Sequence, residues 1–310
     1  MKYLRPIFFA LITLYCADAA AAAAEQLSHL ELKYDGVTRS YELYVPPTYD
    51  DNTALPLVLA LHGRSSSGAR MAHLTDFETR AAEHDFIVAY PDSLNGTWNY
   101  VYGIPGAREG PNDVGFLLRL VEEIGEKYRI DRKRLYVAGI SNGGFMAQRL
   151  ACEHDSGIAA FASVAASGYG AMPGTCKADP PIDALYLHGT SDQLVPWTGH
   201  SVIDDSGESQ LVTMPVSQSL EFWSRLNHCE QKLDAHELPR SGRSPETHVM
   251  VYSTKSCADG ARVALYAVIG GGHNWPGRDG LIPPHISGAV NLDFHATDKI
   301  WAFFDHQPIP

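Results

Sequence analysis

Basic residues are scarce in this chain of 310 residues. Its 24 Lys and Arg face 36 Asp and Glu, which leaves a formal net charge of −12, and no run of basic side chains interrupts that balance. An acidic surface repels phosphate, so the composition argues against a nucleic-acid partner. Hydrophobic residues make up 45% and charged residues 19%. This globular composition excludes a disordered chain, a collagen and a coiled coil.

Metal-binding and membrane-spanning motifs are missing as well. The 14 His residues include no His-Glu-x-x-His, and no two cysteines have Cys-x-x-Cys spacing, so the sequence offers no recognisable zinc site. The apolar run near the N-terminus, residues 7–15, is far shorter than the ~20 residues that a spanning helix needs. No internal repeat and no Pro/Ser-rich linker divides the chain. One domain is therefore expected.

The first 24 residues have the order of a Sec signal peptide. Lys2 and Arg5 precede the apolar run, and an alanine tract that ends at Ala24 follows it. Cleavage is predicted near Ala24, which leaves one mature domain, residues 25–310, outside the cytoplasm. The alternative is an N-terminal helix that stays attached. A lipid anchor on Cys16 is disfavoured because a bulky tyrosine precedes it.

Removal of this leader leaves four cysteines. An even number in an exported chain predicts two disulfides, and the sequence alone allows three pairings. The local pairing closes two short loops, each worth about 3 kcal/mol in the chain-entropy description. Four buried thiols are the alternative. The residues concerned are Cys152, Cys176, Cys229 and Cys257.

Apolar runs alternate with helical patterns along the chain. Residues 114–128 place apolar side chains on one helical face. In residues 30–45, apolar positions alternate with polar ones, which indicates an antiparallel hairpin at the start of a sheet. Strand, helix and strand in succession predict an α/β fold with a mostly parallel central sheet and helices on both faces. Five runs without polar alternation predict its buried strands: residues 56–61, 86–90, 135–138, 184–187 and 263–269.

The sharpest motif is Gly-Ile-Ser-Asn-Gly at residues 139–143, directly after one predicted strand and before a helical pattern. This strand–turn–helix context is that of a nucleophile elbow, in which a tight turn exposes Oγ of Ser141 above the sheet. Glycines flank the serine because a Cβ there would collide with the turn. The alternative is a glycine-rich turn with a capping serine.

A serine nucleophile needs a base and an acid that orients the base. In α/β-hydrolases both follow the serine, the acid first. Asp192 comes soon after the strand predicted at 184–187, and His273 lies in a glycine-rich loop after the strand that ends at residue 269. Both positions fit, although a turn aspartate and a structural loop histidine are the alternatives. His285 and His295 are weaker candidates for the base.

Acyl transfer also needs backbone N–H groups that stabilise an oxyanion. The amide of Asn142, directly after the nucleophile, is one predicted donor. Arg64, in the loop after the strand at 56–61, supplies the other, with the Gly63 amide as second choice. The alternative is that His62-Gly63 is only a turn that ends the strand.

Aromatic side chains are candidates for an acyl or alcohol pocket. Two of them lie close in sequence to the predicted acid and base, although a core position is the alternative. The four candidates are Trp98, Tyr100, Trp197 and Trp275. Asn112 and Asp113 precede the predicted helix at 114–128 and fit a structural N-cap better than a site.

Together these motifs resemble the secreted esterase family that includes poly(3-hydroxybutyrate) depolymerases and related bacterial feruloyl esterases. The resemblance implies the α/β-hydrolase fold, with Ser141 as nucleophile, Asp192 as acid and His273 as base. It also implies disulfides Cys152–Cys176 and Cys229–Cys257. Many members have a small residue where Arg64 stands. The matching segments are LALHGRSSSG (59–68), NDVGFL (112–117), RLYVAGISNGGFMAQRLAC (134–152), LHGTSDQLVPW (187–197), GGGHNWPG (270–277) and FHATDKIWAFF (294–304).

The sequence thus predicts a secreted serine carboxylic-ester hydrolase that needs no metal or other cofactor. Its expected substrates are soluble or oligomeric esters of hydroxyalkanoate or feruloyl type, because no polymer-binding domain follows the hydrolase domain. Neither a membrane anchor nor an obligate protein partner is expected. A serine acyltransferase or peptidase on the same fold is the nearest alternative, and a catalytically inactive binding protein is another.

Overall fold

The computed structural model describes residues 27–101, 110–153, 155–203, 209–278 and 282–309. The predicted signal peptide and its cleavage site near Ala24 lie outside the described residues. Within the described ranges, no helix combines the length and the apolar character needed to span a bilayer.

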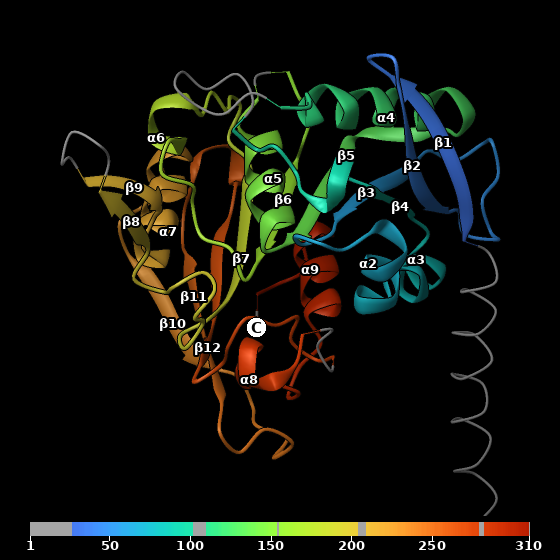
Figure 1. The fold of residues 1–310 in the computed structure, drawn as a ribbon. Helices are drawn as coiled ribbons and strands as arrows, with labels where there is room; N and C mark the ends of the chain where they lie inside the picture. Colours follow the sequence, from blue (N-terminus) through green and yellow to red (C-terminus); the bar gives the residue numbers. More distant parts are fainter. Residues whose placement is uncertain (1–26, 102–109, 154, 204–208, 279–281, 310) are drawn as a thin grey trace, which may run out of the picture.

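One mixed sheet of ten strands runs through the described part of the molecule (Figure 1), in the order β1-β2-β4-β3-β5-β6-β7-β12-β11-β10. The central strands from β4 to β12 are parallel, whereas the outer strands at both edges are antiparallel. The strands are β1 (Ser28–Tyr34), β2 (Val37–Tyr44), β3 (Leu55–Leu61), β4 (Ile87–Pro91), β5 (Ile130–Ile140), β6 (Ala160–Val164), β7 (Asp183–Gly189), β10 (Leu233–Glu237), β11 (His248–Thr254) and β12 (Val263–Ile269).

Helices cover both faces of this sheet. On one face lie α4 (Asp113–Lys127), α5 (Asn142–Ala151) and α7 (Val216–Leu226). On the other face lie α2 (Gly68–Thr75), α3 (Phe77–His84) and α9 (Ala296–Phe304). Shorter elements complete the described chain: α6 (Met172–Thr175), α8 (Pro284–Ser287), the 3₁₀ turns η1 (Leu94–Gly96) and η2 (Ala258–Gly260), and a separate hairpin of β8 (His200–Ile203) and β9 (Ser209–Thr213).

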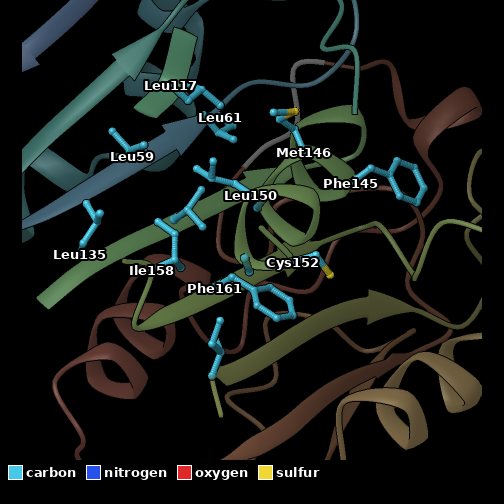
Figure 2. Close-up of a cluster of buried hydrophobic side chains, with 14 of the residues drawn as sticks. Leu59, Leu61, Leu117, Leu135, Phe145, Met146, Leu150, Cys152, Ile158 and Phe161 are labelled. Atoms are coloured by element: carbon cyan, nitrogen blue, oxygen red, sulfur yellow. The ribbon is translucent and has the colours of Figure 1, made fainter. Parts of the chain in front are cut away.

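Strand β3 shows why the central runs lack polar alternation. Leu59 and Leu61 belong to the hydrophobic cluster under α4 and α5, whereas Val58 and Ala60 belong to the cluster under α2, α3 and α9. Figure 2 shows the first cluster, in which Leu150 of α5 lies against the sheet. Both faces of the strand are therefore buried, and every position is apolar.

The predicted architecture is confirmed. The five predicted strands are β3, β4, β5, β7 and β12, the helix predicted at 114–128 is α4, and the starting hairpin is β1–β2. The sequence did not predict β6, in which three of the five residues are Ala or Ser, nor the antiparallel strands β11 and β10. Every position of β10 is exposed or half-buried, so that strand carries no hydrophobic signal.

Two disulfides tie loops to the α4/α5/α7 face. Cys152 is bonded to Cys176, and Cys229 is bonded to Cys257. These are the pairings that the family resemblance implies. The first connects the end of α5 to the end of α6, and the second connects the end of α7 to η2.

Candidate active site

Ser141 lies in the sharp turn between β5 and α5. Its backbone has φ 56° and ψ −121°, a conformation that costs a non-glycine residue about 1–3 kcal/mol. Gly143 lets the start of α5 pass close to the end of β3, because a Cβ there would lie 2.2 Å from the carbonyl oxygen of Leu61. The predicted elbow geometry is therefore present, and the strain is held by the contact between helix and strand.

Asp192 lies in the turn after β7 and orients His273. Its Oδ1 accepts the N–H groups of Leu194 and Val195 at 2.9 and 2.8 Å, and its Oδ2 is 2.8 Å from Nδ1 of His273. An ionised carboxylate only accepts hydrogen bonds, so Nδ1 of His273 carries the proton and Nε2 is the basic nitrogen. None of the described residues hydrogen-bonds to that Nε2.

The acid turn and the histidine loop are joined directly. The N–H of Ser191 donates to the carbonyl of Gly271 at 2.8 Å, and a Cβ on Gly189 would lie 2.3 Å from that same oxygen. Glycine is required at residue 189 because the two backbones touch there. The loop is also held from the other side, since Nδ2 of Asn274 donates to Gly288 and Ala289 carbonyls.

His188 is a buried residue of the site that the sequence analysis did not single out. Its Nε2 is 2.9 Å from the carbonyl of Val195 and 3.6 Å from Oδ2 of Asp192. A carbonyl only accepts, so Nε2 carries the proton, and burial lowers the pKa of His188 despite the nearby Asp192 carboxylate. The neutral ring therefore braces the turn that holds the acid. The sequence signal for this residue is the pair His188-Gly189, which ends its strand as His62-Gly63 ends the strand at 56–61.

A cavity of about 160 Å³ opens over the serine. Ser141 and His273 line it together with Gly63, Arg64 and Ile140. A larger cavity of about 300 Å³ lies between α7 and β12, but its lining includes none of Ser141, Asp192 and His273. The smaller cavity is the candidate active site because Ser141 and His273 both line it.

Of the two predicted oxyanion donors, Arg64 lines this cavity, and Asn142 directly follows Ser141, which also lines it. Asn142 opens α5, where the first N–H groups of a helix have no partner inside the helix. Gly63 approaches the nucleophile, since a Cβ on Gly63 would lie 3.5 Å from Cβ of Ser141. Within the described chain, no hydrogen bond occupies the N–H of Arg64.

The aromatic side chains differ from the prediction. Trp98 is only 1% exposed, its Nε1 donates to the carbonyl of His62 at 3.0 Å, and its backbone N–H and carbonyl bond the side chain of Asn142 at 2.6 and 3.1 Å. The substrate-binding role predicted for Trp98 is therefore corrected to a supporting one. Trp98 exposes almost no surface to a ligand and does not line the cavity of Ser141.

The other aromatics have separate surroundings. Trp275 borders the cavity but is buried, with Nε1 bonded to Oγ1 of Thr297 at 3.1 Å, so it anchors the histidine loop. Trp197 lines the larger cavity and packs edge-on against His188. Tyr100 stacks on Phe145 of α5. The sequence thus placed these residues near the site, but only Trp275 borders the cavity of Ser141.

Asn112 and Asp113, at the start of α4, have different structural roles. Asn112 is the N-cap, and its Oδ1 accepts the N–H of Gly115 at 2.9 Å, which confirms the structural prediction. Asp113 does more than cap: its Oδ1 is 2.8 Å from Nη2 of Arg39 in a buried ion pair, and its Oδ2 accepts the N–H of Asn99 at 2.7 Å.

Comparison with known proteins shows where the chain belongs. NocK of Nocardia uniformis subsp. tsuyamanensis, an esterase by name, is 28% identical over 91% of this chain and 82% of its own length. Feruloyl esterase B of Piromyces equi is 27% identical over 74% of this chain, which spans 41% of that protein. The solved acetyl xylan esterase from Aspergillus awamori has a TM-score of 0.60 at 14% identity, over 90% of this chain and 99% of that one.

The sheet order and the cavity at its strand ends are those of the α/β-hydrolase fold. A family model described as esterase PHB depolymerase matches residues 39–193, half of the chain. The chain belongs to that family and is a carboxylic ester hydrolase.

Proposed function

We propose that this protein is an exported serine esterase in which Ser141, His273 and Asp192 form the catalytic triad. The observation that carries the proposal is the 2.8 Å hydrogen bond between His273 and Asp192 beside the elbow that presents Ser141. His273 and Ser141 line one cavity, and the acid keeps Nε2 of the histidine unprotonated, as a general base requires.

The mechanism has two halves. Oγ of Ser141 attacks the ester carbonyl carbon while Nε2 of His273 takes the hydroxyl proton, and the oxyanion is stabilised by the N–H groups of Arg64 and Asn142. The C–O bond to the alcohol then breaks as His273 protonates the leaving oxygen. Water next gives a proton to His273 and attacks the acyl-serine, and His273 returns that proton to Oγ of Ser141 as the carboxylic acid is released. Asp192 stabilises the imidazolium in both halves.

Feruloyl and acetyl esters of plant polysaccharides are the proposed substrates. Relatives named feruloyl esterase and acetylxylan esterase/xylanase support this class, although the chain spans only 41% and 31% of the two fungal relatives concerned. Hydroxyalkanoate oligomers are the second candidate, because the family description names PHB depolymerase. Parallel assays on methyl ferulate, acetylated xylan fragments and 3-hydroxybutyrate oligomers decide between them. Turnover confined to the oligomers would reassign the substrate.

Export is proposed from two features. The first 24 residues have signal-peptide order, and two disulfides match an oxidising compartment. Expression of the full chain in a bacterial host with Edman sequencing of the processed protein tests this. A mature N-terminus near residue 25 is expected, whereas an intact N-terminus in the cytoplasm would refute export.

Removal of the nucleophile tests the triad. Ser141→Ala is expected to abolish turnover of p-nitrophenyl butyrate and covalent labelling by a fluorophosphonate. Ser253→Ala on β11, outside the cavity lining, is the matched control and should leave both unchanged. Peptide mapping should place the fluorophosphonate on Ser141. Undiminished activity of the Ser141→Ala variant would exclude the serine mechanism.

A further inference from the structure

The His62 ring lies between two backbone groups that fix its protonation state. Its Nε2 is 3.1 Å from the backbone nitrogen of Ser93, and its Nδ1 is 2.7 Å from the carbonyl oxygen of Gly63. An N–H can only donate and a carbonyl can only accept. Both bonds therefore exist together only when His62 is neutral and carries its proton on Nδ1.

The surroundings of the ring favour that neutral form. His62 is 1% exposed, and burial lowers its pKa. The bond to Gly63 and the carboxylates of Asp92 and Asp113 raise the pKa, whereas Arg39 lowers it, and burial outweighs them. The indole of Trp98 covers the ring at a centroid distance of 5.1 Å.

The bond from Nδ1 sets the direction of one peptide unit. In a trans peptide the carbonyl and the following N–H point in opposite directions. Because the Gly63 carbonyl points at the His62 ring, the N–H of Arg64 points away from it. Gly63 and Arg64 line the cavity of Ser141, whereas His62 does not. The Arg64 N–H therefore points away from the buried ring, on a residue that lines the cavity.

Neighbouring groups of the loop are held by other contacts. The His62 carbonyl accepts Nε1 of Trp98 at 3.0 Å, and the Ser65 N–H donates to the Gly96 carbonyl at 2.7 Å. Among the described residues, the His62 ring alone holds the Gly63 carbonyl. Glycine rotates more freely about its backbone bonds than any other residue, so this peptide turns unless it is held.

We propose that His62 is a positioning residue: its ring holds the Gly63 carbonyl away from the cavity and so aims the Arg64 N–H at the oxyanion. The inference rests on the proposed serine mechanism. Without the ring bond, the Gly63–Arg64 peptide rotates and the donor is lost, or the carbonyl oxygen turns towards the developing negative charge.

Three substitutions separate the two ring bonds. The amide nitrogen of His62→Asn lies near the position of Nδ1 and can still donate to Gly63. The amide oxygen of His62→Gln lies near Nε2 and retains only the bond from Ser93. His62→Phe keeps the ring shape without either bond. Each variant is assayed with p-nitrophenyl butyrate and with an alkyl trifluoromethyl ketone. Oγ of Ser141 adds to this ketone, His273 takes the proton, and an alkoxide is left in the oxyanion site.

Loss of one oxyanion donor costs roughly 10²–10³-fold in kcat. The Phe and Gln variants are expected to lose about that factor in kcat with little change in KM, and their inhibition constants for the ketone should rise in parallel. His62→Asn should recover most of the loss. Equal kcat values for the Asn and Gln variants, a loss confined to KM, or unchanged ketone binding would each overturn the inference.

A structural readout covers the case in which a variant folds poorly. Long-range ¹⁵N–¹H correlation spectra of the wild-type His62 ring should show the Nδ1–H tautomer at neutral pH, and the Nε2–H tautomer or an imidazolium would refute the geometry. The Ser141→Ala variant distinguishes a failure of the proposed serine mechanism from a failure of the role proposed for His62. If it stays active, the proposed function fails; if it is inactive while His62→Phe has the wild-type kcat, only the role of His62 fails.

Discussion

Gly143→Ala tests whether the contact between α5 and β3 holds the active site together. A Cβ at residue 143 would lie 2.2 Å from the carbonyl oxygen of Leu61 and 2.5 Å from that of His62. Real Cβ atoms essentially never come closer than 3.0 Å, so the elbow and the end of β3 must separate by about 0.8 Å. Both obstructing atoms belong to the backbone, so no side chain can rotate aside to make room.

The expected cost follows from that displacement. Overpacking at a rigid site costs about 1–3 kcal/mol of unfolding free energy, and a misplacement of about 1 Å lowers the rate of a positioned reaction about 10²-fold. The movement separates Ser141 and the Asn142 N–H from the loop that contains Arg64. With p-nitrophenyl butyrate, kcat is therefore expected to fall by a larger factor than the factor by which KM changes. The midpoint of urea unfolding should also be lower.

Gly174→Ala is the matched control, because a Cβ on this exposed glycine of α6 meets nothing within 4 Å. It should leave kcat and the unfolding midpoint unchanged. The reasoning fails if Gly143→Ala keeps kcat within about threefold of the wild type, because the loop and the elbow then tolerate the separation that the geometry requires.

Further predictions concern the acid, one buried carboxyl and one disulfide. Asp192→Asn should lower kcat roughly 10³–10⁴-fold, because an amide no longer selects the His273 tautomer; steady-state kinetics with unchanged near-UV circular dichroism test this. Burial raises the pKa of Glu78 above its ordinary value. The contribution of Glu78 to the free energy of unfolding is therefore fully present below its ordinary pKa. It is lost as the pH rises through the raised pKa of the folded state. Urea unfolding should show the wild type losing stability relative to Glu78→Gln as pH rises, and a pH-independent difference would contradict this. Replacing Cys229 and Cys257 together with serine should lower the unfolding free energy by about 3 kcal/mol, and an unchanged midpoint would show that the loop is ordered by other contacts.

Where the signal is local, the sequence predicted correctly which residues lie together in the candidate site. Ser141 stands in a strand–turn–helix motif, and Asp192 and His273 follow buried strands in the chain order that an α/β-hydrolase requires. Parallel strands place their carboxyl ends along one edge of the sheet. Recognition of the strands was therefore enough to bring the three residues into one region.

Sequence reasoning failed where a role depends on long-range packing. The sequence pattern does not indicate whether an isolated aromatic side chain such as Trp98 points into a pocket or into the core. The hydrogen-bond partners of Trp98, Asn142 and His62, lie 44 and 36 residues away in the sequence. His62 belongs to the predicted oxyanion loop, with a strand-ending turn as the alternative, but the sequence predicts no role for its side chain. Its two bonds involve an adjacent carbonyl and an amide 31 residues away, and nothing in the local sequence specifies them.

The rigidity of the oxyanion loop extends into the interior of the fold. The Trp98–Asn99 segment that supports the His62 carbonyl is itself held by Asp113, which accepts the Asn99 N–H at 2.7 Å. Asp113 is fixed in turn by its ion pair with Arg39. The Asp113 side chain is 0% exposed and the Arg39 side chain is 2% exposed. Breaking a buried pair by removing one partner costs about 3–5 kcal/mol. The Arg64 N–H is therefore aimed by a buried polar network, and donors held in advance of reaction stabilise an oxyanion better than donors that must reorganise.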